Sequence, residues 1–170
     1  MKKLFRSRNM KGMLFSVSFI VALSLMIGCE VQPENDEIDE VDAPWVLNIE
    51  EATIANDDYR EVVWTGVYMQ MVLMSLEPDE AIALEVHEDH DQFIRLEQGE
   101  ARILMGREEG EMTFDEEIEE GWAGFIPAGY WHEVRNVGLE KLKLYTLYSP
   151  PEHAVDIIHE TEEAAEEYHP

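Results

Sequence analysis

Apolar and polar residues alternate with a period close to two through most of the chain, from residue 45 to residue 150. Turn-forming residues interrupt the alternation at short intervals, and no stretch has the period of a long amphipathic helix. The pattern predicts an all-β body whose strands lie at residues 67–76, 82–86, 92–97, 101–105, 125–126, 132–137 and 142–148. Many short strands are typical of an antiparallel sandwich or barrel, and closing a small barrel would hide the edges of its sheets.

The segment at residues 67–76 differs from the other predicted strands because it is apolar on both faces apart from Gln70 and Ser75. A strand with this composition is expected between two layers of structure. The segment also holds closely spaced methionines, which we interpret as core filler and not as a metal or cofactor site: Met69, Met71 and Met74.

Polar side chains mark one face of the strand at residues 82–86. Strict alternation places Ile82, Leu84 and Val86 on one face, and Ala83, Glu85 and His87 on the other. Gln92 shares its row with Ile94 and Leu96, which indicates that this row points inward. His132 begins another predicted strand, so these polar side chains converge if their rows meet inside a barrel.

The N-terminus has the layout of a secretory signal. Residues 1–12 are basic, residues 13–28 carry no charge, and the apolar run ends at Cys29. Because this run of 16 residues is shorter than the roughly 20 that span a bilayer, we expect a cleaved signal. The sequence Met-Ile-Gly-Cys at residues 26–29 resembles a bacterial lipobox, although the family usually has leucine where Met26 stands. The resemblance implies cleavage before Cys29, lipidation of its thiol and an extracytoplasmic location. The alternative is an uncleaved anchor with an incidental cysteine.

The remaining boundaries follow from changes in composition. We expect a lipoprotein signal peptide at residues 1–28, an acidic extended tether at 29–44, the β-barrel at 45–150 and an acidic tail at 151–170. Within the tail, residues 161–168 predict a short helix, with Thr161 as its N-cap and acids in its first turn.

Charge excludes two classes of partner. The 170 residues hold 12 bases and 38 acids, a net charge of −26. Five of the bases precede residue 29, so the remainder has seven bases against all 38 acids, a net charge of −31. Nucleic acid and anionic lipid surfaces would repel such a body, leaving the N-terminal lipid as its expected contact with the membrane. The single cysteine excludes an intramolecular disulfide framework and a CxxC metal site.

Five residues in the segment GWAGFIPAGYWHEVRN fit the pattern G-x5-P-x-G-x2-H-x3-N: Gly121, Pro127, Gly129, His132 and Asn136. This pattern is the second motif of the cupins, so the chain resembles a small single-domain cupin of the cupin-2 type. The resemblance covers roughly residues 47–160 and implies a jelly-roll β-barrel, with a homodimer as the common assembly.

The first cupin motif, G-x5-H-x-H-x3-4-E-x6-G, is met only in part. With its last glycine aligned on Gly99, His87 takes the place of the second histidine. Three positions depart from the motif: Asp79 replaces its first glycine, Glu85 its first histidine and Gln92 its glutamate. The strand spacing described above gives a separate reason to keep Glu85 and Gln92 in the site.

Together, Glu85, His87, Gln92 and His132 would supply two imidazoles, one carboxylate and one amide oxygen. Two histidines and a carboxylate with open positions suit Fe(II) best, while Mn, Ni, Co and Zn would also be accepted. Gln92 is the weakest of these ligands because its amide is neutral. The alternative is a hydrogen-bonded polar cluster that holds no metal.

Other polar residues are better explained as surface residues than as metal ligands or catalytic groups. We expect His90 to be a surface histidine, and three histidines of the tail to be solvated: His153, His159 and His169. Four acids are expected to form an exposed hairpin end: Glu116, Glu117, Glu119 and Glu120. Tyr130 is expected to line the substrate site, whereas Trp131 could equally pack in the core.

Two classes of function remain. The first is an extracytoplasmic metal-dependent cupin enzyme, an isomerase or dioxygenase acting on a small oxygen-bearing substrate. The second is a non-catalytic module that binds a small ligand for a sensor or transporter.

Overall fold

The computed structural model describes residues 43–167, which form ten strands and two short helices. The strands are β1 (Arg60–Thr65), β2 (Gln70–Leu76), β3 (Ala81–Val86), β4 (Asp91–Gln98), β5 (Glu100–Gly106), β6 (Phe114–Glu119), β7 (Ala123–Ile126), β8 (Trp131–Asn136), β9 (Leu142–Ser149) and β10 (Ile158–His159). The helices are α1 (Ile49–Ala55) and α2 (Glu162–Glu166). No helix in this part of the chain is long and apolar enough to cross a membrane.

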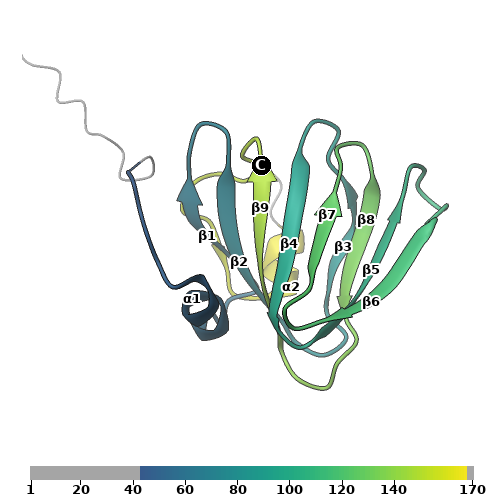
Figure 1. The fold of residues 1–170 in the computed structure, drawn as a ribbon, viewed down its shortest axis with the longest axis horizontal. Helices are drawn as coiled ribbons and strands as arrows, with labels where there is room; N and C mark the ends of the chain where they lie inside the picture. Colours follow the sequence, from purple (N-terminus) through teal and green to yellow (C-terminus); the bar gives the residue numbers. More distant parts are fainter. Residues whose placement is uncertain (1–42, 168–170) are drawn as a thin grey trace, which may run out of the picture. The chain divides into compact units, whose positions relative to one another are not determined.

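The strands form two antiparallel sheets (Figure 1). One sheet has the order β10-β1-β2-β9-β4-β7, and the other has the order β3-β8-β5-β6. Their inner faces enclose one apolar core, which includes Val72, Met74, Ile94, Val134 and Leu144. The prediction of an all-β jelly-roll barrel with a short C-terminal helix is confirmed, including the Thr161 cap, whose side chain accepts a hydrogen bond from Ala164 N.

Two residues of the second cupin-like motif have structural roles. Asn136 is fully buried and donates to the carbonyls of Leu76 and Glu140, at 3.0 and 2.9 Å, while its side-chain oxygen accepts from Gly138 N. Gly129 has a φ of 75°, a conformation that favours glycine, and its N–H donates to the carbonyl of His87 at 2.7 Å. The motif therefore ties the turn before β8 to the end of β3.

Asp79 shows how the chain tolerates the loss of a motif glycine. Its φ is 71°, in the left-handed region where the motif has glycine. Aspartate enters this region more readily than most residues, so it can take the place of glycine in the turn before β3.

Several predictions of local structure are wrong. The strand predicted at residues 67–76 begins only at Gln70, because residues 67–69 form an exposed turn. The strand itself, β2, is buried on both faces as expected. Met69 belongs to that turn and is 41% exposed, so only Met71 and Met74 are core filler. The acids expected at a hairpin end instead belong mostly to β6, an exposed strand at the edge of its sheet.

The alternation predicted for residues 82–86 is broken by a β-bulge. The pairing of β3 with β8 shifts register between Ile82 and Glu85. Ile82 is therefore buried in the core, while Leu84 is 40% exposed. Glu85 points inward, although strict alternation would place it on the face of the strand that Ile82 does not share. The bulge lets one strand supply both a core residue and a site residue.

Candidate functional site

Three candidate ligands converge where β3 and β8 pair. Glu85 lies directly opposite His132 in the antiparallel register, and His87 follows the end of β3. Glu85 Oε1 lies 3.3 Å from His87 Nε2 and 3.4 Å from His132 Nε2. One ligand atom from each of the three residues lies within 4.8 Å of the others, which is close enough to bind one metal ion.

Gln92 reaches the same interior from β4. Its side chain is buried, and its amide nitrogen donates to Thr146 Oγ1 and to the Tyr148 hydroxyl, each at 3.1 Å. These two donations orient the amide. Tyr148 also packs edge-on against His87, with ring centroids 5.6 Å apart, which places Gln92 beside the cluster.

Within residues 43–167, each of the four candidate ligands has a buried atom that forms no regular hydrogen bond: Glu85 Oε1, His87 Nε2, Gln92 Oε1 and His132 Nε2. Arg60, Ser75 and His153 also have such an atom, but only in the ligand cluster do several of these atoms face one another, at 3.3 and 3.4 Å. Buried polar atoms nearly always have partners, and leaving one unpaired is costly. Because these two nitrogens and two oxygens are of the kinds that bind divalent first-row metals, the residues fit such an ion.

The electrostatics of the cluster favour a charged carboxylate. Burial opposes ionisation of Glu85, but hydrogen bonding and charge from His132 and His87 hold its pKa well below the usual range. Burial likewise opposes protonation of His87, but the neighbouring Glu85 and Glu152 raise its pKa. In the metal-free protein, Glu85 and His87 therefore favour each other's charged forms.

Both histidines are oriented by contacts at their second ring nitrogen. His132 Nδ1 lies 3.0 Å from the carbonyl of Tyr130, and His87 Nδ1 lies 3.5 Å from Glu152 Oε1. A proton held on each Nδ1 leaves Nε2 free to bind a metal, the usual arrangement around metal-binding histidines.

Comparison with known proteins identifies the family. Residues 72–148 match Cupin_2, the cupin domain. The chain belongs to the cupin superfamily. The crystal structure of BH2720 from Bacillus halodurans is 44% identical to this cupin, with a TM-score of 0.72, and the match covers 73% of this chain and 94% of that one.

Two further relatives are similar in sequence. YrkC of Bacillus subtilis is 43% identical over 118 residues, which are 69% of this chain and 63% of YrkC. L612 of Acanthamoeba polyphaga mimivirus is 44% identical over 110 residues, which are 64% of this chain and 67% of L612. The match to YrkC thus spans less than two thirds of that protein.

The structure of this cupin adds a second group of side chains beside the cluster. His90, predicted to lie at the surface, has a side chain that is only 16% exposed, and its Nε2 lies 3.1 Å from Glu152 Oε2. Its Nδ1 lies 2.9 Å from the exposed Asp89. Glu152 therefore links His87 to His90, and it was missed because nothing in the sequence connects the segment after β9 with the loop between β3 and β4.

Gln70 fixes the backbone that carries Glu152. Its buried side chain accepts from the N–H groups of Glu152 and His153 and donates to the carbonyl of His153, at 3.3, 2.8 and 2.8 Å. His153 is half-buried against Tyr148, with ring centroids 5.0 Å apart, and His159 is buried on β10. The prediction that these two histidines are solvated is wrong, because the tail folds back over the barrel; His169 lies outside the described residues.

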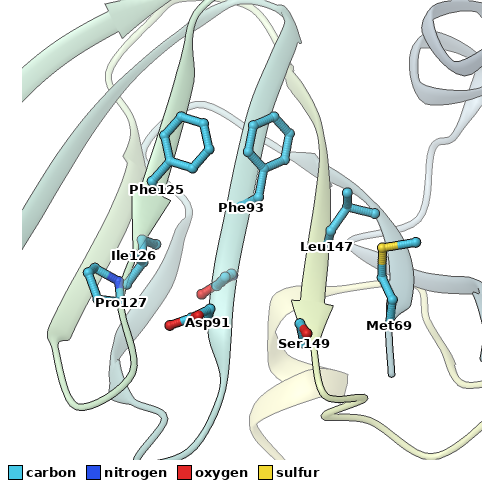
Figure 2. Close-up of a pocket in the computed structure, with 9 residues that line it drawn as sticks. Met69, Asp91, Phe93, Phe125, Ile126, Pro127, Leu147 and Ser149 are labelled. Carbon is cyan, nitrogen blue, oxygen red and sulfur yellow. The ribbon is translucent and has the colours of Figure 1, made fainter. Parts of the chain in front are cut away.

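A cavity of about 440 Å³ lies away from the cluster (Figure 2). Its lining is mainly apolar, and it includes Phe93 of β4 and Phe125 of β7, whose rings lie side by side with centroids 5.1 Å apart. Among the residues that line it, the only titratable side chain is that of Asp91. Gln92 also borders it, but the histidines and Glu85 do not, so this cavity lacks the groups for the chemistry expected of the cluster.

Two other predicted site residues lie apart from the ligands. Tyr130 is half-buried, and its ring faces the Arg107 guanidinium at 4.7 Å, so its contact with the cluster is through its backbone carbonyl to His132. Cys29, the predicted lipidation site, lies outside the described residues.

Proposed function

We propose that this cupin is an extracytoplasmic, lipid-anchored protein that binds one divalent metal ion and a small oxygen-bearing substrate, acting as a metal-dependent isomerase or dioxygenase. The observation that carries the proposal is the convergence of ligand atoms from Glu85, His87 and His132 within 4.8 Å of one another, beside the buried amide of Gln92. In a hydrogen-bonded polar cluster, Glu85 Oε1 would pair with the two Nε2 atoms at 3.3 and 3.4 Å, but Gln92 Oε1 would still lack a partner. That unpaired oxygen, beside three ligand atoms that lie within 4.8 Å of one another, favours the metal.

The residues have distinct roles in the proposed site. Glu85, His87 and His132 hold the metal, and Gln92 adds a neutral oxygen whose direction is set by Thr146 and Tyr148. Glu152 positions His87 without binding the ion itself. When bound, the metal supplies a Lewis acid or an O2-binding centre for substrate oxygens at its open positions, and the two-histidine, one-carboxylate set favours Fe(II).

Turnover separates the enzyme from a binding module. The full chain is purified, loaded with Fe(II) or Mn(II), and tested against sugars for isomerisation and against diols and phenols for O2 consumption. We expect turnover that is lost in Glu85→Gln and kept in Glu117→Gln, which changes an exposed glutamate of β6. A metal-loaded protein that binds members of these panels but converts none would show a non-catalytic module instead.

The lipid anchor and the assembly rest on sequence and resemblance. Mass spectrometry of protein from the membrane fraction should find Cys29 as the first residue, carrying a diacylglycerol. An intact Met1 would contradict the lipoprotein proposal. Light scattering of the purified protein should give the mass of a homodimer, and a monomer mass would contradict that part.

A further inference from the structure

A second cavity, of about 280 Å³, opens directly onto the candidate metal site. Its lining includes Glu85 and Glu152 together with Arg60 of β1 and His153. Glu166 of α2 also borders it. A ligand in this cavity would therefore touch both the ligand cluster and groups that come from the two ends of the described chain.

Arg60 and Arg107 differ from the other described cations because neither forms an ion pair. Residues 43–167 contain seven lysines and arginines, and five of them form ion pairs: Arg95 with Glu97, Arg102 with Asp115, Arg135 with Glu133, Lys141 with Glu77, and Lys143 with Asp57. The Arg107 guanidinium stacks on the Tyr130 ring, 4.7 Å from its centroid, and the Arg60 guanidinium lies farther from the Tyr59 ring, at 5.8 Å. Arg60 has no carboxylate within ion-pair distance among the described residues, although acids outnumber bases about threefold in this protein.

The position of Arg60 directs it inward. It lies two residues before the core residue Val62, so the two share the inner face of β1. Its Nε is buried and lacks a hydrogen-bond partner within the described residues, as does His153 Nε2. A buried guanidinium nitrogen without an acceptor is costly, which indicates that a ligand oxygen completes the site.

The acids around the cavity limit the charge of that ligand. Three carboxylates line the cavity, those of Glu85, Glu152 and Glu166, and they would repel a dianion more strongly than a monoanion. A planar carboxylate also matches the fork of donors on a guanidinium. Both considerations favour a monocarboxylate over a phosphate.

We propose that this cavity binds a small monocarboxylate, such as a 2-hydroxy acid, with its carboxylate on Arg60 and its neighbouring oxygen turned toward the Glu85 cluster. The contact of that second oxygen rests on the proposed metal function, whereas the contact with Arg60 does not. The proposal narrows the substrate of the site from any oxygen-bearing molecule to a small acid.

Glycolate, ethylene glycol and inorganic phosphate are suitable probes, titrated by NMR or calorimetry into the full chain with and without Mn(II). We expect glycolate to bind more tightly than either of the others. Arg60→Gln should weaken glycolate binding about 10- to 100-fold while leaving the metal content unchanged. Arg107→Gln, which removes the other arginine without an ion pair, should leave glycolate binding unchanged.

A second pair of variants does not depend on Arg60→Gln folding. Ala83→Glu places a carboxylate at the wall of the cavity and should block glycolate, whereas Ala164→Glu adds the same charge on α2 outside the lining and should not. Glycolate affinity that is insensitive to Arg60→Gln or Ala83→Glu, or no tighter than that of ethylene glycol, would overturn the proposal. Wild-type protein that takes up no Mn(II) but binds glycolate through Arg60 would count against the proposed function alone.

Discussion

At the scale of single residues, the candidate site depends on how a few side chains are held. His87 lies between two carboxylates, with Glu85 at its Nε2 and Glu152 at its Nδ1. Spacing and motif predicted Glu85, His87, Gln92 and His132, because strand periodicity and the cupin pattern both act over short distances along the chain. Arg60 and Glu152 were not predictable in this way, because only the fold brings β1 and the segment after β9 to the same cavity.

Glu152 should strengthen metal binding without being a ligand. Glu152→Gln keeps the shape of the side chain but weakens the acceptor at His87 Nδ1, so we expect the affinity for Co(II) to fall about 10- to 100-fold. Competition titration against a chelator measures this change. Glu166→Gln, which borders the same cavity from α2, is the matched control and should have the wild-type affinity. An unchanged affinity in Glu152→Gln would show that Glu152 does not position His87.

His153 should make stability depend on pH in the metal-free protein. Burial, together with the charge of Arg60, lowers the pKa of His153 to about 3 from its usual 6.5. The unfolded chain therefore binds this proton more tightly than the folded chain, and the contribution of His153 to stability falls as the pH drops below 6.5.

His153→Phe keeps an aromatic ring against Tyr148 and removes the titration. As the pH falls from 7.5 to 5, the wild type should lose on the order of 2 kcal/mol more free energy of unfolding than the variant does. Urea denaturation of both proteins at both pH values measures this difference. A difference between the two proteins that does not change with pH would contradict this account of His153.

At the scale of elements, the strands were more predictable than their irregularities. Alternation indicated most strands, since one face of each packs against the core. It could not reveal the bulge in β3, because a single extra residue exchanges the two faces without changing the composition of the strand. Helix α1 was missed because its seven residues are too few to establish a helical period.

Asn136 should be the most important polar residue for holding the elements together. Asn136→Ala removes a buried hydrogen bond to the Leu76 carbonyl and two part-buried ones, to the Glu140 carbonyl and from the Gly138 N–H, so we expect a loss of about 2–4 kcal/mol in free energy of unfolding. Asn48→Ala, which removes the exposed N-cap of α1, should cost about 1 kcal/mol or less. Equal losses in the two variants, measured by urea denaturation, would contradict this role for Asn136.

At the scale of the whole molecule, the main electrostatic feature is the large net negative charge. Many of the acids lie on exposed surfaces, such as the outer edge strand β6, where they repel one another. Raising the salt concentration from about 0.05 M to about 0.5 M screens this repulsion, so the free energy of unfolding should increase. Thermal denaturation at the two concentrations tests this, and a melting temperature that is indifferent to salt would contradict it.

The metal content of the purified full chain tests the central claim most directly. After reloading with Fe(II) or Mn(II) and removal of free ions, elemental analysis should find about one ion per chain in the wild type and in Glu117→Gln. Glu85→Gln and His132→Ala should retain almost none. A wild type that keeps no ion, or variants that keep as much as the wild type, would contradict the metal site.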